Sequence, residues 1–176
     1  MTSSCRGIEI PAEWFARPNG ELGSRLHGVE HTRRVLIHAT ELGATLGLVP
    51  GEIEAVSHAA LWHDIGRTHD GVDYYHGAKS AGKVIGLGLH EGIDRYVLDL
   101  ALFAVTHHSG SEEHAERAAT SRHTADPAAT LRVFRVLKDA DGLDRVRLGD
   151  LDVSYLRFPE SRERIDRAWE LLRESG

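Results

Sequence analysis

The sequence predicts an all-α protein, a compact bundle of helices in a single domain. Apolar residues recur with the period of a helix in every long segment, and no run alternates convincingly between polar and apolar residues as a strand does. Glycine and proline stand where helices would end or begin, as Gly47 and Pro50 do. With 176 residues, 41% of them hydrophobic, the chain can bury one substantial core.

These signals divide the chain into successive helices. A short first helix is expected near Pro11, followed by longer helices, the last of which is amphipathic and starts at Pro159. The longer helices are expected at 24–46, 50–65, 76–87, 91–108, 126–146 and 159–174. The polar stretches 67–75 and 109–125 are predicted to be loops, the second of them a mobile loop or lid. We expect residues 1–176 to form one domain with its motif-bearing core at 24–146.

Composition narrows the range of partners. The net charge of −6 and the pI near 6.0 give no electrostatic reason to expect nucleic acid or an anionic membrane as a partner. Cys5 is the only cysteine, so no disulfide forms within one chain, which fits a reducing compartment. No signal peptide or run of about 20 apolar residues is present. We therefore expect a cytoplasmic protein, and a homo-oligomer is compatible with the sequence.

Twelve histidines are unusual beside four phenylalanines and four tyrosines, so their positions on the predicted helices matter. A step of about 100° per residue places His31, Asp64, His108 and Asp141 on the apolar faces of four helices. A single buried histidine is usually a hydrogen-bonded core residue, whereas buried carboxylates need a cation or several donors. Convergence of both types favours a divalent metal. The histidines expected on the surface or in loops are His38, His69, His90, His114 and His123.

Two further acidic residues lie near Asp141 in the sequence. Helix angles turn Asp139 away from the core, and they turn Asp144 toward it. Asp144 is therefore either a residue that orients a metal ligand or a charge on the helix surface, and both interpretations stay open. Lys138, which precedes these residues, is expected to have a structural role through Asp141 or Asp144.

The order of these residues resembles a known family. His31 begins the segment HTRRV, which resembles the family pattern H-x-x-R-V, and residues 62–67 (WHDIGR) resemble H-D-I-G-[KR]. Asp141 lies in KDADGLD, which resembles A-D-x-L-[DH]. Together they are similar to the H…HD…D signature of the HD-domain superfamily, over about 27–144. The resemblance implies a helical fold and metal-dependent phosphohydrolase activity, often on nucleotides or phosphodiesters.

Additional histidines resemble those of His-rich members of this family. His76 begins HGAKSA, similar to H-x-x-x-[SG]-A, and the pair His107-His108 resembles the paired histidines that bind a second metal in those members. The resemblance implies one or two divalent ions (Fe, Mn, Ni, Co, Mg or Zn), with Asp64 as the bridge if there are two. The alternative is one ion, with the extra histidines lining the substrate pocket. The implied ligand set is His31, His63, Asp64, His76, His107, His108 and Asp141.

Other residues are assigned roles in hydrolysis of a small phosphate ester. A metal lowers the pKa of a bound water from 15.7 toward about 7, which supplies a nucleophile at neutral pH. Asp64 and Arg67 are the expected catalytic residues, and Arg67, Lys79 and Arg34, in that order, are expected to bind the phosphate. His27 either has a catalytic role, in which it contacts the substrate or assists proton transfer to the leaving group, or is a partly exposed histidine.

Two departures from the family patterns and two alternative functions remain. Ser109 stands where a glutamate often follows the paired histidines, and the G-Y-P segment of cyclic dinucleotide phosphodiesterases is missing. The same ligands would serve a mixed-valent di-iron oxygenase, and a non-catalytic metal- or ligand-binding module is a third reading. The sequence does not identify the substrate. It favours a nucleotide over other phosphates, because Trp62, Tyr74 or Tyr75 could stack on a base.

Overall fold

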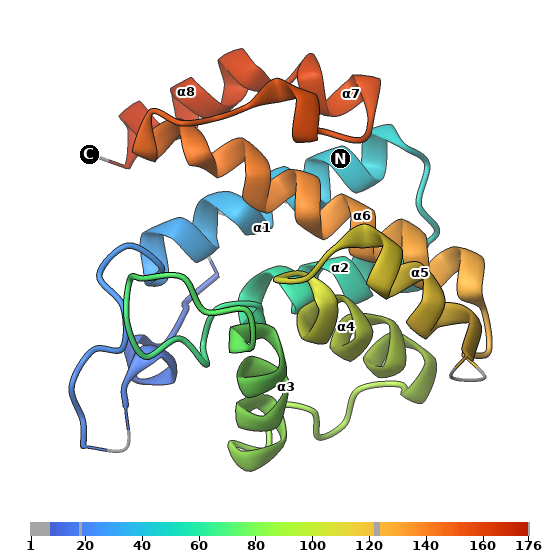
Figure 1. Ribbon diagram of the computed structural model, residues 1–176, viewed down its shortest axis with the longest axis horizontal. Coiled ribbons are helices and arrows are strands. Elements are labelled where there is room, and N and C mark those ends of the chain that lie inside the picture. Colours follow the sequence, from blue (N-terminus) through green and yellow to red (C-terminus); the bar gives the residue numbers. More distant parts are fainter. Residues whose placement is uncertain (1–7, 18, 122–123, 176) are drawn as a thin grey trace.

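The computed structural model describes residues 8–17, 19–121 and 124–175 (Figure 1). Within these residues the chain forms helices and turns, with one isolated β-bridge between Ala16 and Leu22. The prediction of an all-α protein is thereby confirmed. The α-helices are α1 (Val29–Thr45), α2 (Pro50–Trp62), α3 (His76–Gly86), α4 (Arg95–His107), α5 (Glu112–Ser121), α6 (Pro127–Leu143), α7 (Pro159–Arg162) and α8 (Ile165–Glu174). The short 3₁₀ helices are η2 (Ala12–Phe15), η3 (Asp144–Leu148) and η4 (Val153–Tyr155).

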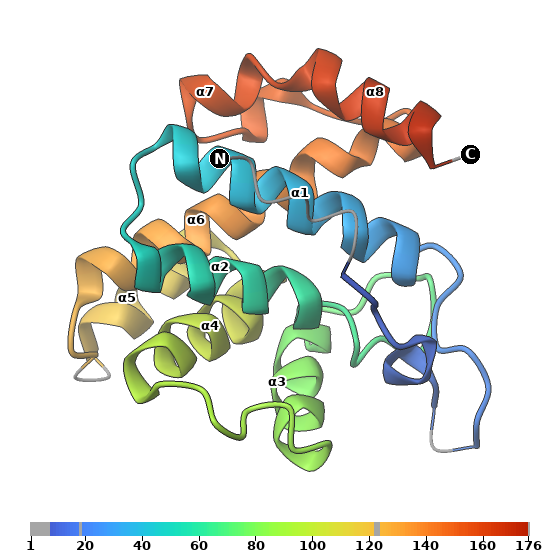
Figure 2. The ribbon, with the colours of Figure 1, turned by 180° about the vertical axis from the view of Figure 1, so that it is seen from behind.

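Helices α1, α2, α4 and α6 pack around the main core, which includes fully buried Leu36, Val56 and Phe134. Helices α7 and α8 lie across the outer side of α1 and α6 (Figures 1 and 2). A smaller apolar cluster that contains Leu143 and Ala168 joins α8 to the end of α6. Among the described residues, no helix combines the length and apolar character that crossing a membrane would require.

Two helices begin later than their periodicity predicts, and a carboxylate explains each difference. The helix predicted from residue 24 begins at Val29, because the preceding turn wraps around Asp70, whose Oδ1 accepts hydrogen bonds from the backbone of Arg25 (3.0 Å) and Leu26 (3.1 Å). The helix predicted from residue 91 begins at Arg95, because the Asp94 side chain caps it and accepts from the first free backbone N–H groups.

The prediction of a loop or lid at 109–125 was wrong. Most of this segment forms helix α5, which packs against α6 and buries only the small side chains of Ala115 and Ala119. Ion pairs from Glu112 and Glu116 to Arg135 of α6, each 2.6 Å long, hold the helix in place. The polar composition concealed the helix because its buried face needs only alanines.

Asp139 also lies where its helix angle did not place it. Its fully buried carboxylate accepts hydrogen bonds from the backbone of Arg157 (2.8 Å) and Phe158 (3.0 Å), from Ser161 Oγ (2.7 Å) and from the Arg157 guanidinium (3.0 Å). The chain that leads into α7 returns over α6 and covers a face that is solvent-exposed in an isolated helix. Asp139 therefore anchors the C-terminal helices to α6.

His38 is buried rather than exposed, which corrects the prediction of a surface residue. Its side chain is inaccessible to solvent on α1, and neither ring nitrogen has a hydrogen-bond partner among the described residues. Burial, together with the positive charge of Arg164, lowers the pKa of His38 to about 3. The other histidines assigned to the surface or loops, His69, His90 and His114, are exposed or half-buried, and His123 lies outside the described residues.

The buried His38 predicts a loss of stability in acid. Below pH 6.5 the unfolded chain binds a proton at this histidine while the folded protein does not, so folding loses up to about 1.4 kcal/mol per pH unit down to pH 3. We expect His38→Leu to gain about 2–3 kcal/mol over wild type between pH 6.5 and 4.5, and to be at least as stable at pH 7.5. Urea unfolding at several pH values measures this difference. Parallel pH profiles of the two proteins would contradict it.

Candidate metal centre

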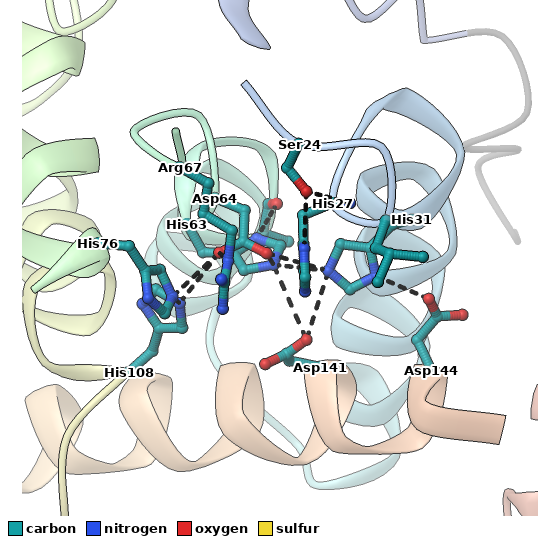
Figure 3. Close-up of polar contacts among 12 residues, drawn as sticks. Ser24, His27, His31, His63, Asp64, Arg67, His76, His108, Asp141 and Asp144 are labelled. Atoms are coloured by element: carbon teal, nitrogen blue, oxygen red, sulfur yellow. Dashed lines mark hydrogen bonds and ion pairs between the residues drawn. The ribbon is translucent and has the colours of Figure 1, made fainter. Parts of the chain in front are cut away.

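The carboxylate of Asp64 lies between two pairs of histidines (Figure 3). Its Oδ2 is 3.4 Å from Nε2 of both His31 and His63, and its Oδ1 is 3.1 Å from Nε2 of His76 and 3.6 Å from that of His108. All five side chains are buried. The candidate ligand atoms of each pair and Asp64 lie within 4.8 Å of one another. Asp64 therefore presents one oxygen to each of two sites of metal-binding size.

Hydrogen bonds fix which nitrogen of each histidine faces this centre. The Nδ1 atoms of His63, His76 and His108 lie 2.8, 2.5 and 2.7 Å from the backbone carbonyls of residues 60, 73 and 105. A carbonyl only accepts, so each Nδ1 carries the proton and each Nε2 turns a lone pair inward. His31 Nδ1 likewise donates to Asp144 at 2.7 Å. Each Nε2 is therefore prepared to bind a cation.

The inward nitrogens lie close to one another. Nε2 of His31 is 3.1 Å from Nε2 of His63, and Nε2 of His76 is 2.8 Å from Nε2 of His108. Two lone pairs at such distances repel unless a proton or a metal ion lies between or beside them. Nitrogen and carboxylate donors in this combination suit Fe, Mn, Co, Ni or Zn, so the residues present fit a divalent metal.

Two glycines allow α3 to approach closely enough to supply the second pair. A Cβ on Gly66 would lie 2.3 Å from the Ser80 backbone nitrogen, and a Cβ on Gly77 would lie 2.5 Å from the Val105 carbonyl oxygen. Gly66 follows Asp64 by two residues, and Gly77 follows His76 directly. Because no side chain separates the backbones, α3 packs against both the end of α2 and the end of α4 and brings His76 to His108.

Asp141 completes the side of the centre that carries His31. Its Oδ1 lies 3.4 Å from His31 Nε2 and 3.9 Å from His63 Nε2, and its side chain is 38% exposed. Helix α6 thus delivers a carboxylate to the same place as α1 and α2. Asp64 is buried and Asp141 is partly exposed, so the centre meets solvent on the side of Asp141.

Asp144 lies behind His31 and holds it in place, so the reading of it as a surface charge is wrong. The carboxylate is inaccessible to solvent and receives the Nε and Nη2 of Arg34 at 2.5 and 3.1 Å. The guanidinium of Arg34 is therefore buried against Asp144, which corrects the prediction that Arg34 binds substrate. Arg34 instead orients Asp144, which orients His31.

In the centre, neighbouring charges counteract the effect of burial on the pKa values of the side chains. Burial alone would raise the pKa of Asp64, but His63 and the hydrogen bonds from His108 and His31 hold it well below its usual range. Burial would lower the pKa of His31, but the Asp144 and Asp64 carboxylates raise it to about 9. The centre therefore holds ionised carboxylates that attract a cation, and a metal ion binding at His31 would displace a proton.

Arg67 and His27 flank the centre. Arg67 Nε donates to Asp64 Oδ1 at 3.1 Å, so its guanidinium lies beside the oxygen that faces the second pair of histidines. His27 packs edge-on against His31 with ring centroids 5.5 Å apart, and its side chain is only 13% exposed. The hydroxyl of Ser24 donates to Asp70 and lies 2.9 Å from His27 Nδ1. His27 Nδ1 therefore carries a proton that it donates to Ser24, and its Nε2 can accept another.

Two predicted site residues lie apart from these groups. The ring of His107 packs against Phe103 and His114, with centroids 4.4 and 5.5 Å away, and points in a different direction from its neighbour His108. Within the described residues it belongs to neither candidate metal group, which corrects its assignment as a ligand. Lys79, in α3, is half exposed. Its ammonium pairs at 2.7 Å with Asp73, which lies on the loop before α3, and not with the residues of the centre.

Comparison with known proteins supports the sequence resemblance. The family model described as HD domain matches residues 28–146, which cover α1 to α6 and all the residues of the candidate centre except His27. No curated protein and no solved structure matches the chain.

Proposed function

The chain belongs to the HD-domain family, and from this premise we propose that it hydrolyses small phosphate esters with divalent metal held around Asp64. The observation that carries the proposal is the two-sided Asp64 carboxylate, with one oxygen toward His31 and His63 and the other toward His76 and His108. This arrangement favours two ions over one, because each oxygen has its own pair of imidazole nitrogens. Two ions about 3.5–4 Å apart suit in-line displacement at phosphorus.

Residues of the chain would bind the phosphate and transfer protons. When bound, divalent metal would supply an acidified water and neutralise phosphate charge. Arg67 would contact a phosphate oxygen, because its guanidinium lies beside Asp64 at the centre. Burial lowers the pKa of His27 to about 4, so this imidazole is neutral at pH 7 and its Nε2 can accept a proton from the attacking water. The same nitrogen could then return the proton to the leaving oxygen.

Reconstitution with single metals tests this function. Protein stripped by a chelator and then supplied with Mn²⁺, Fe²⁺, Co²⁺, Ni²⁺, Zn²⁺ or Mg²⁺ should hydrolyse p-nitrophenyl phosphate or a nucleoside monophosphate. We expect at least one metal to raise the rate about a hundredfold or more over the stripped protein, because the metal contributes several kcal/mol of transition-state stabilisation. Phosphate release measures the rate.

The same preparations separate phosphohydrolase from oxygenase chemistry. Iron-loaded protein that consumes oxygen with an organic substrate, and no metal form that releases phosphate, would contradict the proposal in favour of a di-iron oxygenase. Metal-loaded protein that does neither would indicate a binding module. The phosphohydrolase proposal holds only if phosphate release follows metal content.

A further inference from the structure

A cavity of about 330 Å³ opens beside the candidate centre, between the end of α6, η3 and the segment that carries η4. His108 and Asp141 line its inner end, so the cavity adjoins the residues that would hold metal. Lys138 and Tyr155 line it further out. A volume of this size lies at the lower end of the range of small-molecule sites. None of the sequence motifs indicated this cavity, because the segment after α6 carries no family pattern.

Lys138 supplies a cation to the cavity wall. Its ammonium donates to the carbonyl of Gly110 at 2.7 Å and lies 5.6 Å from the ring centroid of Phe134. Within the part of the chain that the structure describes, this carbonyl is its hydrogen-bond acceptor, and an ammonium carries three N–H donors. Because Lys138 precedes Asp141 by one helical turn, the two side chains lie on the same side of α6.

The other cations of the cavity already have carboxylate partners. Arg157 pairs with the buried Asp139 at 3.0 Å and with Glu112 at 2.6 Å, and Arg145 pairs with Asp150. These guanidiniums build the wall and neutralise the acids beside them. Lys138 is therefore the cation in the described wall of the cavity whose donors remain available to an anion.

Tyr155 gives the outer part of the cavity an aromatic surface. It lies in the short 3₁₀ helix η4 and is 75% exposed, although it lines the cavity. Asp152 caps this helix by accepting from Ser154 N at 2.9 Å, so the position of η4 is fixed locally. An exposed tyrosine ring on a short, capped turn offers one flat face to a planar group.

We propose that this cavity is the substrate subsite, in which Lys138 contacts the phosphate and Tyr155 packs against a planar ring in the organic part of a phosphate monoester. The inference rests on the proposed function only in placing the phosphate toward Asp141. It assigns the substrate to monoesters with a single ring system, because the cavity is small and Arg157, which Asp139 holds at 3.0 Å, forms part of its wall. Lys138 is thus a substrate-binding residue rather than a purely structural one.

Binding of two phosphonates tests the subsite without requiring turnover. Phenylphosphonate and methylphosphonate share the anionic group, and only the first carries a ring. Isothermal titration of the Mn²⁺-loaded full chain should show tighter binding of phenylphosphonate. We expect Tyr155→Ser to weaken phenylphosphonate about fivefold to tenfold and to leave methylphosphonate within twofold, while Tyr155→Phe retains the preference. Lys138→Gln should weaken both ligands about tenfold or more, and Lys138→Arg should recover part of the loss.

Controls separate this inference from folding defects and from the proposed function. Tyr96→Ser removes another partly exposed tyrosine, outside the cavity, and should leave both affinities unchanged. Thermal unfolding and Mn²⁺ content of each variant exclude a general loss of structure. Equal affinity of wild type for the two phosphonates, or loss of the preference in Tyr74→Ser but not in Tyr155→Ser, would overturn the subsite. Tyr155-dependent binding without phosphate release would support the subsite and count against the hydrolase.

Discussion

Replacing Asp64 by asparagine is expected to abolish metal binding at both sites and to lower kcat/KM for phosphate esters at least about a thousandfold. The amide has one neutral oxygen, so it cannot offer an anionic ligand both to the side of His31 and to the side of His76. Several kcal/mol of transition-state stabilisation are lost together with the metal. Metal analysis after purification without chelator, combined with phosphate release, measures both effects.

Asp99→Asn is the matched control for that variant. Asp99 lies on the exposed side of α4, pairs with Arg95 at 2.9 Å, and, among the described residues, belongs to neither candidate metal group. The control should keep the wild-type metal content and rate. A variant at Asp64 that keeps its metal, or that loses metal without losing activity, would contradict the role given to this carboxylate.

Asp144→Ala is expected to have the largest effect on stability. The substitution leaves the buried guanidinium of Arg34 without its carboxylate, and a broken buried ion pair costs about 3–5 kcal/mol of unfolding free energy. His31 also loses the acceptor that fixes its tautomer, so metal affinity should fall about 10–100-fold. Urea unfolding and metal titration measure the two quantities separately.

The double variant Arg34→Met/Asp144→Ala distinguishes the two consequences. Removing the Arg34 cation as well should recover part of the lost stability, because Arg34 is then no longer left unpaired. The recovery should be incomplete, because Arg147, whose Nε lies 3.0 Å from Asp144 Oδ2, still loses its carboxylate partner. The metal affinity should stay low, since His31 still has no partner at Nδ1. Wild-type metal affinity in either variant would contradict the orienting role of Asp144.

Helix periodicity and the family patterns agree on the residues at the core of the candidate site. His31, Asp64 and Asp141 lie on the buried faces of their helices at the positions of the H…HD…D signature, and the structure brings them together. Periodicity alone could not predict that His76 and His108 lie side by side. Their approach depends on close contacts of glycine backbones between α3 and its neighbours, which belong to tertiary structure.

Several of the wrong predictions share one physical origin. Helix angles assign residues to faces of an isolated helix, whereas a second layer can cover a polar face and bury what lies on it. The chain near α7 covers Asp139, and α8 packs near α1, where His38 is buried. His107 illustrates the opposite case, because adjacent positions on a helix point about 100° apart and only His108 reaches the centre. The cation Arg34 was assigned to substrate because its buried carboxylate partner lies 110 residues away.

Anomalous diffraction from crystals grown with Mn²⁺ tests the central claim most directly. The account predicts two peaks, one on each side of the Asp64 carboxylate, the first bound also by His31, His63 and Asp141 and the second by His76 and His108. A protein that binds no ion at Asp64, with its four imidazoles arranged around ordered water instead, would contradict the metal centre and the hydrolysis that depends on it.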